Sequence, residues 1–382
     1  MNCTRRSFLK GGIASLFLGS LNFPLFASNS QKKNLVVIML RGGMDGMTAV
    51  PLTSDTSYEK LRKGIILSNN LKLDSNFALH PKLSFVHELW KKNMAGIVHA
   101  TNIPYIGRSH FDGQNLMESG GKIPYLEKSG WLGRGLELSK LHSNLTLSLP
   151  SPLILRGSKQ VDNFYPGIIG KIPKPEYIMH LRDRFEKNGD NKIVDILNLV
   201  IQRPPEMLVT NDLVDLSTVA GKLLKDPAGP RVAVFDLEGF DTHGQQGDLE
   251  GQHADHLSEI DQIIEILYDQ LQEDFDNTLV VTVTEFGRTI EQNGAAGTEH
   301  GYGSAIIMAG GILKKSQVFS DWPGLKSKDL FEGRDLMSTI DSRSIYASAM
   351  SSVFDIEFEQ IKRKVFWNDP LVNFSEKLFK YS

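Results

Sequence analysis

The sequence predicts an α/β fold in which helices cover a mostly parallel central sheet. Continuous apolar runs indicate strands buried on both faces, as in a parallel sheet shielded by helices. Stretches with apolar residues three and four positions apart lie between these runs and indicate amphipathic helices. Strands that alternate with helices of this length are typical of a helix-covered parallel sheet.

The first predicted strand is the apolar run Asn34–Leu40, which follows two lysines and precedes Arg-Gly-Gly. The later predicted strands are Arg231–Leu237, Asn277–Thr284 and Ser304–Ala309. The predicted helices are Leu83–Lys91, Ile193–Ile201 and Leu257–Leu271. Segment 150–230 is richer in proline and charge, and we expect it to pack as an insertion or cap over the sheet. No convincing linker divides the chain.

The amino terminus has the pattern of a twin-arginine export signal. Arg5 and Arg6 precede Phe-Leu-Lys and a mildly apolar stretch that ends near Ala27. A membrane anchor is the alternative, but the apolar stretch is shorter than the ~20 residues of a spanning helix, and Asn22 and Pro24 interrupt it. We therefore expect a signal peptide at 1–27, a single periplasmic domain at 28–382 and no stable transmembrane segment after cleavage.

Composition excludes several classes of protein. Of 382 residues, 41% are hydrophobic and 23% charged, which rules out a disordered, collagen-like or coiled-coil chain. The formal charge of −3 becomes more negative once the signal is removed, so no basic field indicates a nucleic-acid partner. Cys3 is the only cysteine, which excludes a disulfide framework, a thiolate zinc site and a cysteine nucleophile. Many proteins exported by the twin-arginine route carry a metal, so the signal raises the expectation of one.

Polar residues collect directly after the predicted strands, where ligands of open α/β sheets bind. After the first strand, Asp45 lies among glycines and is either a metal ligand or a structural residue of the turn. Before a predicted helix, Ser109 is a candidate nucleophile or a helix cap. Beside it, His110 is a candidate base or ligand, and Arg108 could hold an anionic group.

The remaining candidates follow the last strands. Asp241 and His243 are two positions apart in one loop and could bind the same cation. Glu285 ends a strand, and His300 lies on the loop that returns to the next strand, so the two should approach each other. Further along, His253 and His256 are expected to be mostly solvated on a helix.

These motifs occur in an order that resembles a largely uncharacterised bacterial family of exported proteins, grouped by fold with the alkaline phosphatase/sulfatase superfamily. The motifs are Leu-Arg-Gly-Gly-Met-Asp-Gly from Leu40, Arg-Ser-His-Phe-Asp from Arg108, Phe-Asp-Thr-His-Gly from Phe240, Thr-Glu-Phe-Gly-Arg-Thr from Thr284 and Gly-Thr-Glu-His-Gly from Gly297. The resemblance covers roughly 34–355 and implies a three-layer α/β/α sandwich. It also implies a Ser nucleophile at Ser109 and metal ligation by Asp45, Asp241, His243, Glu285 and His300.

One position departs from the superfamily pattern. The second residue of the usual Asp-His motif is Phe286, which cannot bind a metal. A single metal is therefore more consistent with the sequence than two, in an oxygen-rich site open to zinc, calcium, magnesium or manganese. A Cys/Ser-x-Pro-x-Arg sulfatase signature is absent, which excludes a formylglycine nucleophile.

The leading hypothesis is a periplasmic, metal-dependent hydrolase of small phosphate or sulfate esters. Ser109 would attack, and Arg108 or Arg288 would bind the anionic group. Whether Ser109 or Thr298 faces the metal depends on loop geometry and stays open. The alternative is a non-catalytic exported binding or scaffold protein that retains the fold and a partial metal site. An exported peptidase or a glycoside hydrolase are further alternatives.

Overall fold

The computed structural model describes residues 32–65, 69–139, 145–146, 151–158, 162–163, 175–187, 193–194, 197, 213–227 and 229–381. The predicted export signal at 1–27 lies outside these residues, as do nearly all of the predicted helix at 193–201 and much of the predicted insertion at 150–230. Residues Lys33–Ser382 form one compact unit. Within the described ranges, no helix combines the length and apolar character that crossing a bilayer requires.

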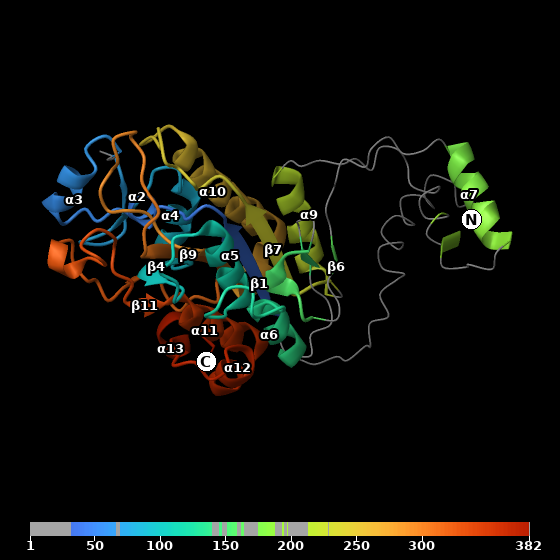
Figure 1. The fold of residues 1–382 in the computed structure, drawn as a ribbon. Coiled ribbons are helices and arrows are strands. Elements are labelled where there is room, and N and C mark those ends of the chain that lie inside the picture. Colours follow the sequence, from blue (N-terminus) through green and yellow to red (C-terminus); the bar gives the residue numbers. More distant parts are fainter. Residues whose placement is uncertain are drawn as a thin grey trace. The chain divides into compact units, whose positions relative to one another are not determined.

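A nine-stranded sheet forms the centre of this unit, in the order β10-β4-β9-β8-β1-β7-β5-β6, with β11 beside β4 (Figure 1). Its strands are β1 (Asn34–Leu40), β4 (Ala95–Asn102), β5 (Leu145–Thr146), β6 (Asp162–Asn163), β7 (Val232–Leu237), β8 (Thr278–Thr284), β9 (Ser304–Ala309), β10 (Val318–Phe319) and β11 (Ile340–Asp341). A separate pair consists of β2 (Leu71–Lys72) and β3 (Ala78–Leu79). All pairs in the large sheet are parallel except those of β9 with β4 and β8, which confirms the mostly parallel sheet.

The apolar runs did not predict the antiparallel direction of β9 or the existence of β4. Strand β9 follows β8 without an intervening helix. It can pair with β8 in the antiparallel direction because, unlike parallel neighbours, antiparallel neighbours need no long crossover connection. The central strand β4 was not predicted because Gly96 and His99 interrupt its apolar pattern. Both of these residues nevertheless lie in a strand that is buried along its whole length.

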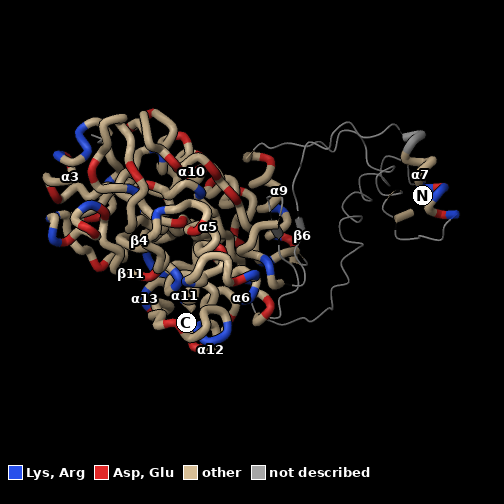
Figure 2. Tube along the Cα trace, viewed as in Figure 1, with Lys and Arg blue, Asp and Glu red and all other residues tan. Residues whose placement is uncertain are grey.

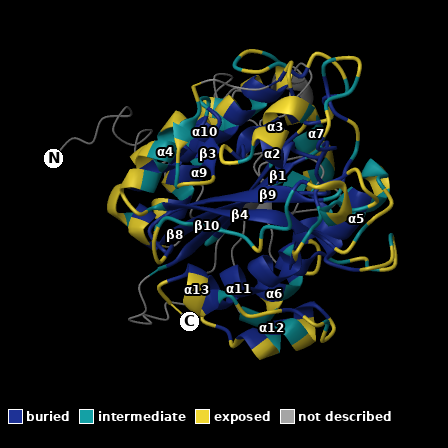
Figure 3. Ribbon diagram, turned by 90° about the vertical axis from the view of Figure 1, so that its left-hand side faces the viewer, coloured by how far each residue is buried: buried dark blue, intermediate teal, exposed yellow. Residues whose placement is uncertain are grey.

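The sheet has a hydrophobic core on each face, because successive side chains of a strand point to opposite sides. In β1, Val36 and Ile38 belong to one core, and Leu35 and Val37 belong to the other. The first core is covered by α2 (Gly46–Ala49), α3 (Thr56–Leu61), α4 (Ser84–Lys91), α9 (Leu213–Lys225) and α10 (Gln252–Leu271). The second is covered by α5 (His110–Ser119), α6 (Trp131–Ser139), α11 (Ser342–Phe354), α12 (Phe358–Val365) and α13 (Ser375–Leu378). The predicted three-layer α/β/α arrangement is confirmed, with buried strands between two helical layers (Figure 3).

The remaining short elements are α7 (Pro175–Lys187) and the 3-10 helices η1 (Leu153–Leu155), η2 (Gln272–Asn277) and η3 (Ser327–Asp329). Along the described trace, acidic and basic residues alternate in small groups instead of gathering into blocks of one sign (Figure 2).

Strand direction brings distant loops to one edge of the sheet. Strands β1, β7 and β8 are parallel, and β4 has the same direction because both β4 and β8 are antiparallel to β9. The carboxyl ends of these four strands therefore lie at the edge where β9 begins. The loops after β1, β4, β7 and β8 and the loop before β9 meet there.

Candidate metal centre

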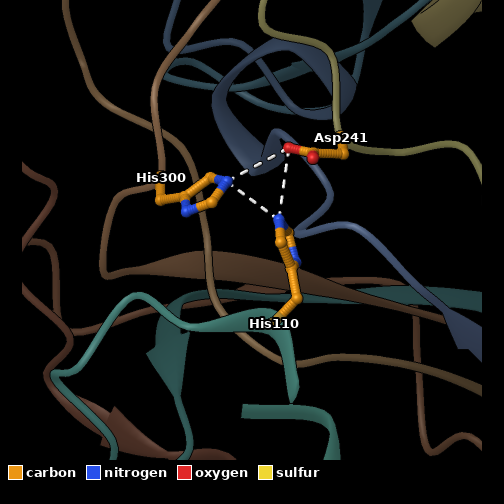
Figure 4. A group of neighbouring side chains, drawn as sticks. All are labelled: His110, Asp241 and His300. Atoms are coloured by element: carbon orange, nitrogen blue, oxygen red, sulfur yellow. Dashed lines mark hydrogen bonds and ion pairs between the residues drawn. The ribbon is translucent and has the colours of Figure 1, made fainter. Parts of the chain in front are cut away.

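Three histidines and one aspartate meet at this edge, from three of the converging segments. His110 is the first residue of α5, Asp241 and His243 follow β7, and His300 precedes β9. An isolated antiparallel bridge between Arg288 and His300 folds the last loop back over the end of β8. The rings of His110 and His300 point toward each other and toward the Asp241 carboxylate (Figure 4).

The ligand atoms of the four residues are close together. The Nε2 atom of His300 lies 2.8 Å from Nε2 of His110 and 2.9 Å from Nε2 of His243. The Oδ1 atom of Asp241 lies 3.0 to 3.2 Å from these three nitrogens. Neighbouring ligand atoms around a tetrahedral zinc ion are about 3.3 Å apart. His110, Asp241 and His300 form one mutually close group that could hold a cation, and His243 adjoins it through its contacts with Asp241 and His300.

The second nitrogen of each imidazole has a partner of its own. Nδ1 of His110 lies 2.9 Å from Glu285 Oε1, and Nδ1 of His243 lies 2.8 Å from Glu299 Oε2. Nδ1 of His300 lies 2.8 Å from the backbone oxygen of Arg108. A carbonyl or carboxylate oxygen can only accept, so each Nδ1 carries the proton. Carboxylate and carbonyl partners of this kind orient histidine ligands in metal sites.

This tautomer leaves an electrostatic problem that a cation solves. In the neutral rings, the Nε2 atoms of His110 and His243 each present a lone pair to Nε2 of His300, and all three nitrogens present lone pairs to the carboxylate of Asp241, so none of these short contacts is an ordinary hydrogen bond. Three carboxylates, those of Asp241, Glu285 and Glu299, surround the cluster. The chemistry of the donor set therefore fits a divalent cation. The ligand side chains are 21 to 43% exposed, so the centre is open to solvent.

The charges of the site perturb its protonation. Burial disfavours the charged form of Asp241, but the hydrogen bond and the charge of Arg288, together with the charges of His110 and His243, outweigh burial and lower the pKa of Asp241 to about 2. Burial likewise disfavours charged His110, and the Glu285 carboxylate reverses this and raises the pKa of His110. For His300 burial dominates and lowers the pKa. Asp241 is thus an anion at neutral pH, as a ligand must be.

Glu285 is brought to the site, but it is not placed as a ligand. Its buried Oε1 accepts hydrogen bonds from Gly42 N and Gln114 Nε2 in addition to its contact with His110. Glu285 is thus in position to orient His110, whose Nε2 faces the candidate ligand atoms of Asp241 and His300. The neighbouring Phe286 packs against His110 and His300, with ring centroids 4.9 and 5.2 Å away.

Asp45 is not part of the cluster. It is fully buried, caps α2 through Met47 N and Thr48 N, and its Oδ2 accepts from Arg62 at 2.5 Å and Gln246 at 2.7 Å. Arg62 is itself completely buried. Both carboxylate oxygens are therefore used in a structural network, and the turn interpretation of Asp45 describes its position better than the ligand interpretation.

The two arginines expected to bind an anion are both engaged. Arg108 pairs with Asp335 at 2.8 Å and with Glu332 at 2.5 Å, and its backbone has φ +55°, a strained value for a residue other than glycine. That backbone turns the Arg108 carbonyl toward His300. Arg288 is buried and donates to Asp241 and to backbone oxygens of the loops after β1 and β7. Arg288 therefore joins the loops and holds the aspartate.

The two candidate hydroxyl groups each have a structural hydrogen bond. Ser109 precedes His110, and its Oγ accepts the Asp112 amide at 3.5 Å as the cap of α5. Thr298 is buried, and its hydroxyl donates to Gln246 at 2.8 Å, so it belongs to the Asp45 network. The expectation that His253 is solvated is wrong: its side chain is 1% exposed, and neither ring nitrogen has a hydrogen-bond partner.

Comparison with known proteins shows that part of the chain is similar to an uncharacterised family. Residues 221–363 match the sequence profile of a family described as "Protein of unknown function (DUF1501)". The matched segment contains Asp241, His243, Glu285 and His300 but not His110. It bears out the expected resemblance to an uncharacterised family. A search of curated proteins found no matching sequence.

Several solved structures align with the chain at low identity. Ps i-CgsB, in complex with k-i-k-neocarrahexaose, is 12% identical over 86% of this chain and 74% of its own, with a TM-score of 0.40. The C-terminal periplasmic domain of EptC from Escherichia coli, in complex with Zn, is 10% identical over 74% of each chain, with a TM-score of 0.36. A protein in the alkaline phosphatase superfamily from Vibrio parahaemolyticus is 12% identical over 76% of this chain and 63% of its own, with a TM-score of 0.36.

Proposed function

We propose that this chain is an exported, metal-dependent hydrolase of phosphate or sulfate esters. The convergence of three imidazole Nε2 atoms on one carboxylate oxygen, with every Nδ1 already paired, is the observation that supports it most strongly. The cluster lies at the carboxyl end of a mostly parallel sheet and is open to solvent, where a substrate can reach it.

The proposed ligands are His110, Asp241, His243 and His300. When bound, a divalent cation would polarise the ester and stabilise the negative charge that develops on its oxygens. Three nitrogens and one oxygen favour zinc over calcium and magnesium, which prefer sets made only of oxygens. The donor set is thus richer in nitrogen than the sequence led us to expect.

The other residues of the site position these ligands. Glu285 and Glu299 accept the Nδ1 protons of His110 and His243 and increase the basicity of both rings. Arg288 holds Asp241 as an anion. Asn293 donates to Glu299 at 2.6 Å and to the backbone oxygen of His243 at 2.7 Å, and thereby ties the two loops together.

The nucleophile in this proposal is the hydroxyl of Ser109, at the amino terminus of α5. Its oxygen uses one lone pair on the Asp112 amide, which leaves its proton and second lone pair for substrate chemistry. The helix dipole stabilises negative charge at this position. Turnover that persists in Ser109→Ala, with metal content unchanged, would identify water as the attacking group.

One observation favours a second candidate function, a metal-binding protein without catalysis. Arg108 and Arg288 are both occupied by acidic partners and backbone oxygens, so neither is ready to bind an anionic substrate. A scaffold protein would keep the metal and the fold and would need no free guanidinium. The two candidates differ in turnover but not in metal content.

The first experiment is elemental analysis of the purified protein by mass spectrometry. We expect one equivalent of metal, lost in His300→Ala and in Asp241→Asn. His87→Ala is the matched control, because His87 bonds to Lys72 O at 2.9 Å and belongs to another surface. The metal-loaded protein is then assayed with phosphate monoesters, phosphate diesters and sulfate esters. Stoichiometric metal without any turnover would contradict the hydrolase and favour the scaffold.

A further inference from the structure

A set of large apolar side chains is exposed on the segment 106–126, which includes His110 of the candidate metal centre. We call it the apolar rim; it consists of Ile106 (61% exposed), Phe111 (81%), Ile123 (60%), Tyr125 (50%) and Leu126 (61%). The described residues expose ten large apolar side chains, and five of them fall within 106–126. Single exposed apolar residues are common on protein surfaces, whereas a group of this kind marks a contact site.

Hydrogen bonds fix the rim in place. The backbone N–H of Tyr125 donates to Asn115 Oδ1 at 2.7 Å, and the Tyr125 side chain also bonds to that of Asp112. Lys128 Nζ donates to the Tyr125 oxygen at 2.8 Å. The backbone of Tyr125 has φ +63°, so the loop is held in a strained conformation that these contacts must support. The 123–126 segment is thus attached to the first turns of α5.

The same helix begins at the metal centre. His110, whose Nε2 faces the other ligands, is followed directly by Phe111, the most exposed apolar side chain of the rim. On the other side of His110, the Tyr105 hydroxyl donates to the backbone oxygen of Ser109 and anchors the loop that carries Ile106. The rim residues therefore lie on α5, which begins with His110, on the loop before it and on the 123–126 segment bonded to it.

We propose that the apolar rim binds the apolar group of the substrate, and that the substrates are esters with an aryl or long alkyl group. The anionic end would lie at the metal centre, so this inference rests on the proposed function for that end. The occupant follows from continuity: Phe111 is the next residue after His110 in the first turn of α5, so a ligand that extends outward from His110 has the exposed Phe111 ring within reach. Contact of an apolar group with the rim removes apolar surface from water on both partners.

The test uses phosphonates, which bind like phosphate esters but are not hydrolysed. The zinc-loaded full-length chain is titrated calorimetrically with methylphosphonate and phenylphosphonate. We expect phenylphosphonate to bind about tenfold more tightly, from the area that a phenyl ring buries. In Phe111→Ser this preference should fall to about twofold or less. Val372→Ser is the matched control, because Val372 is 54% exposed and lies beside α11; it should keep the full preference.

Each other outcome overturns the inference. Equal affinity of the wild-type protein for both phosphonates, no binding of either, or a preference that survives in Phe111→Ser would each remove the rim from ligand binding. Binding to phosphatidylcholine vesicles that is lost in Phe111→Ser, without a preference among phosphonates, would assign the rim to a membrane surface instead. Failure of the proposed function would give a different result. If the protein preferred phenylphosphonate but did not hydrolyse phenyl phosphate or phenyl sulfate, ligand binding by the rim would be supported and the proposed hydrolase activity would be contradicted.

Discussion

Asp45 and Glu285 are both buried carboxylates, and we assign a structural role to the first and support of the candidate metal centre to the second. Substitution of each residue tests this assignment. The sequence presents both as ligands after strands, yet the structure places only Glu285 against a histidine of the cluster. We predict that Asp45→Asn and Glu285→Gln both destabilise the fold, and that only Glu285→Gln weakens zinc binding.

The cost of Asp45→Asn follows from its pairing with Arg62. The two side chains are 1% and 0% exposed and their charged atoms lie 2.5 Å apart. Breaking a buried ion pair on one side costs about 3–5 kcal/mol because the other charge stays buried. The asparagine retains one oxygen for the remaining donors, so we expect a loss near 3 kcal/mol. The zinc dissociation constant should stay within about threefold of the wild-type value, since Asp45 has no contact with the ligands.

The effect of Glu285→Gln is different in kind. The Oε1 atom of Glu285 accepts from Gly42, Gln114 and His110, and its Oε2 accepts from the Thr284 hydroxyl at 3.3 Å; a glutamine can keep only one of these two oxygens and has no negative charge. The loss of stability should be about 1–3 kcal/mol. Removal of the charge that orients a histidine ligand weakens metal affinity by about 10- to 100-fold.

The assays are urea-induced unfolding of the metal-free proteins and calorimetric zinc titration of each variant. Asp55→Asn is the control, because Asp55 caps α3 at an exposed position where asparagine caps equally well. If folded Asp45→Asn no longer bound zinc, or Glu285→Gln bound it as tightly as the wild type, the assignment of the two carboxylates would be refuted.

Three further predictions concern protonation and packing. Burial lowers the pKa of His253 to about 3, so between pH ~6.5 and 3 His253 binds a proton in the unfolded chain but not in the folded chain. Unfolding free energy should thus fall by about 1.4 kcal/mol per pH unit from pH ~6.5 toward 3, and His253→Leu should remove this contribution in urea titrations at pH 7 and 5. Zinc affinity should decrease as the pH falls below 7, because Glu285 raises the pKa of His110 and protons then compete for the ring; titrations at pH 8 and 6 that agree would contradict this. Gly43→Ala should cost more than ~1 kcal/mol and weaken zinc binding, because Gly43 has φ +73° and a Cβ would lie 2.8 Å from the Phe286 ring; unchanged thermal unfolding would count against it.

The strands were predictable from the sequence where burial on both faces requires apolar residues at nearly every position. Strands β1, β7 and β8 have mostly apolar runs, with polar exceptions such as Asp236 in β7 and Thr282 in β8, because each strand is enclosed by helices on two sides. Strand β4 is equally buried, but His99 satisfies one ring nitrogen on the Val50 oxygen and the other on the Ala100 amide, so a polar residue is tolerated there. Local patterns cannot show such partners, because they come from tertiary contacts.

The site was predictable in its location but not in the roles of its members. Placement after parallel strands was enough to bring Asp241, His243 and His300 together. This placement could not show which residue is a candidate ligand and which residue orients it, because the contact between Glu285 and His110 joins two different loops. Glu299 was missed for the same reason: it adjoins His300 in the sequence but pairs with His243.

The structure also changes the interpretation of Phe286. In the sequence, it replaces a histidine ligand and argues for an incomplete site. In the structure, its ring packs against His110 and His300, and His110 reaches the cluster from the start of α5. An apolar residue is needed at position 286 because a polar side chain beneath two imidazoles would compete for their nitrogens. The start of α5 thus places His110 beside Asp241 and His300, and these three residues could hold an ion without a histidine at position 286.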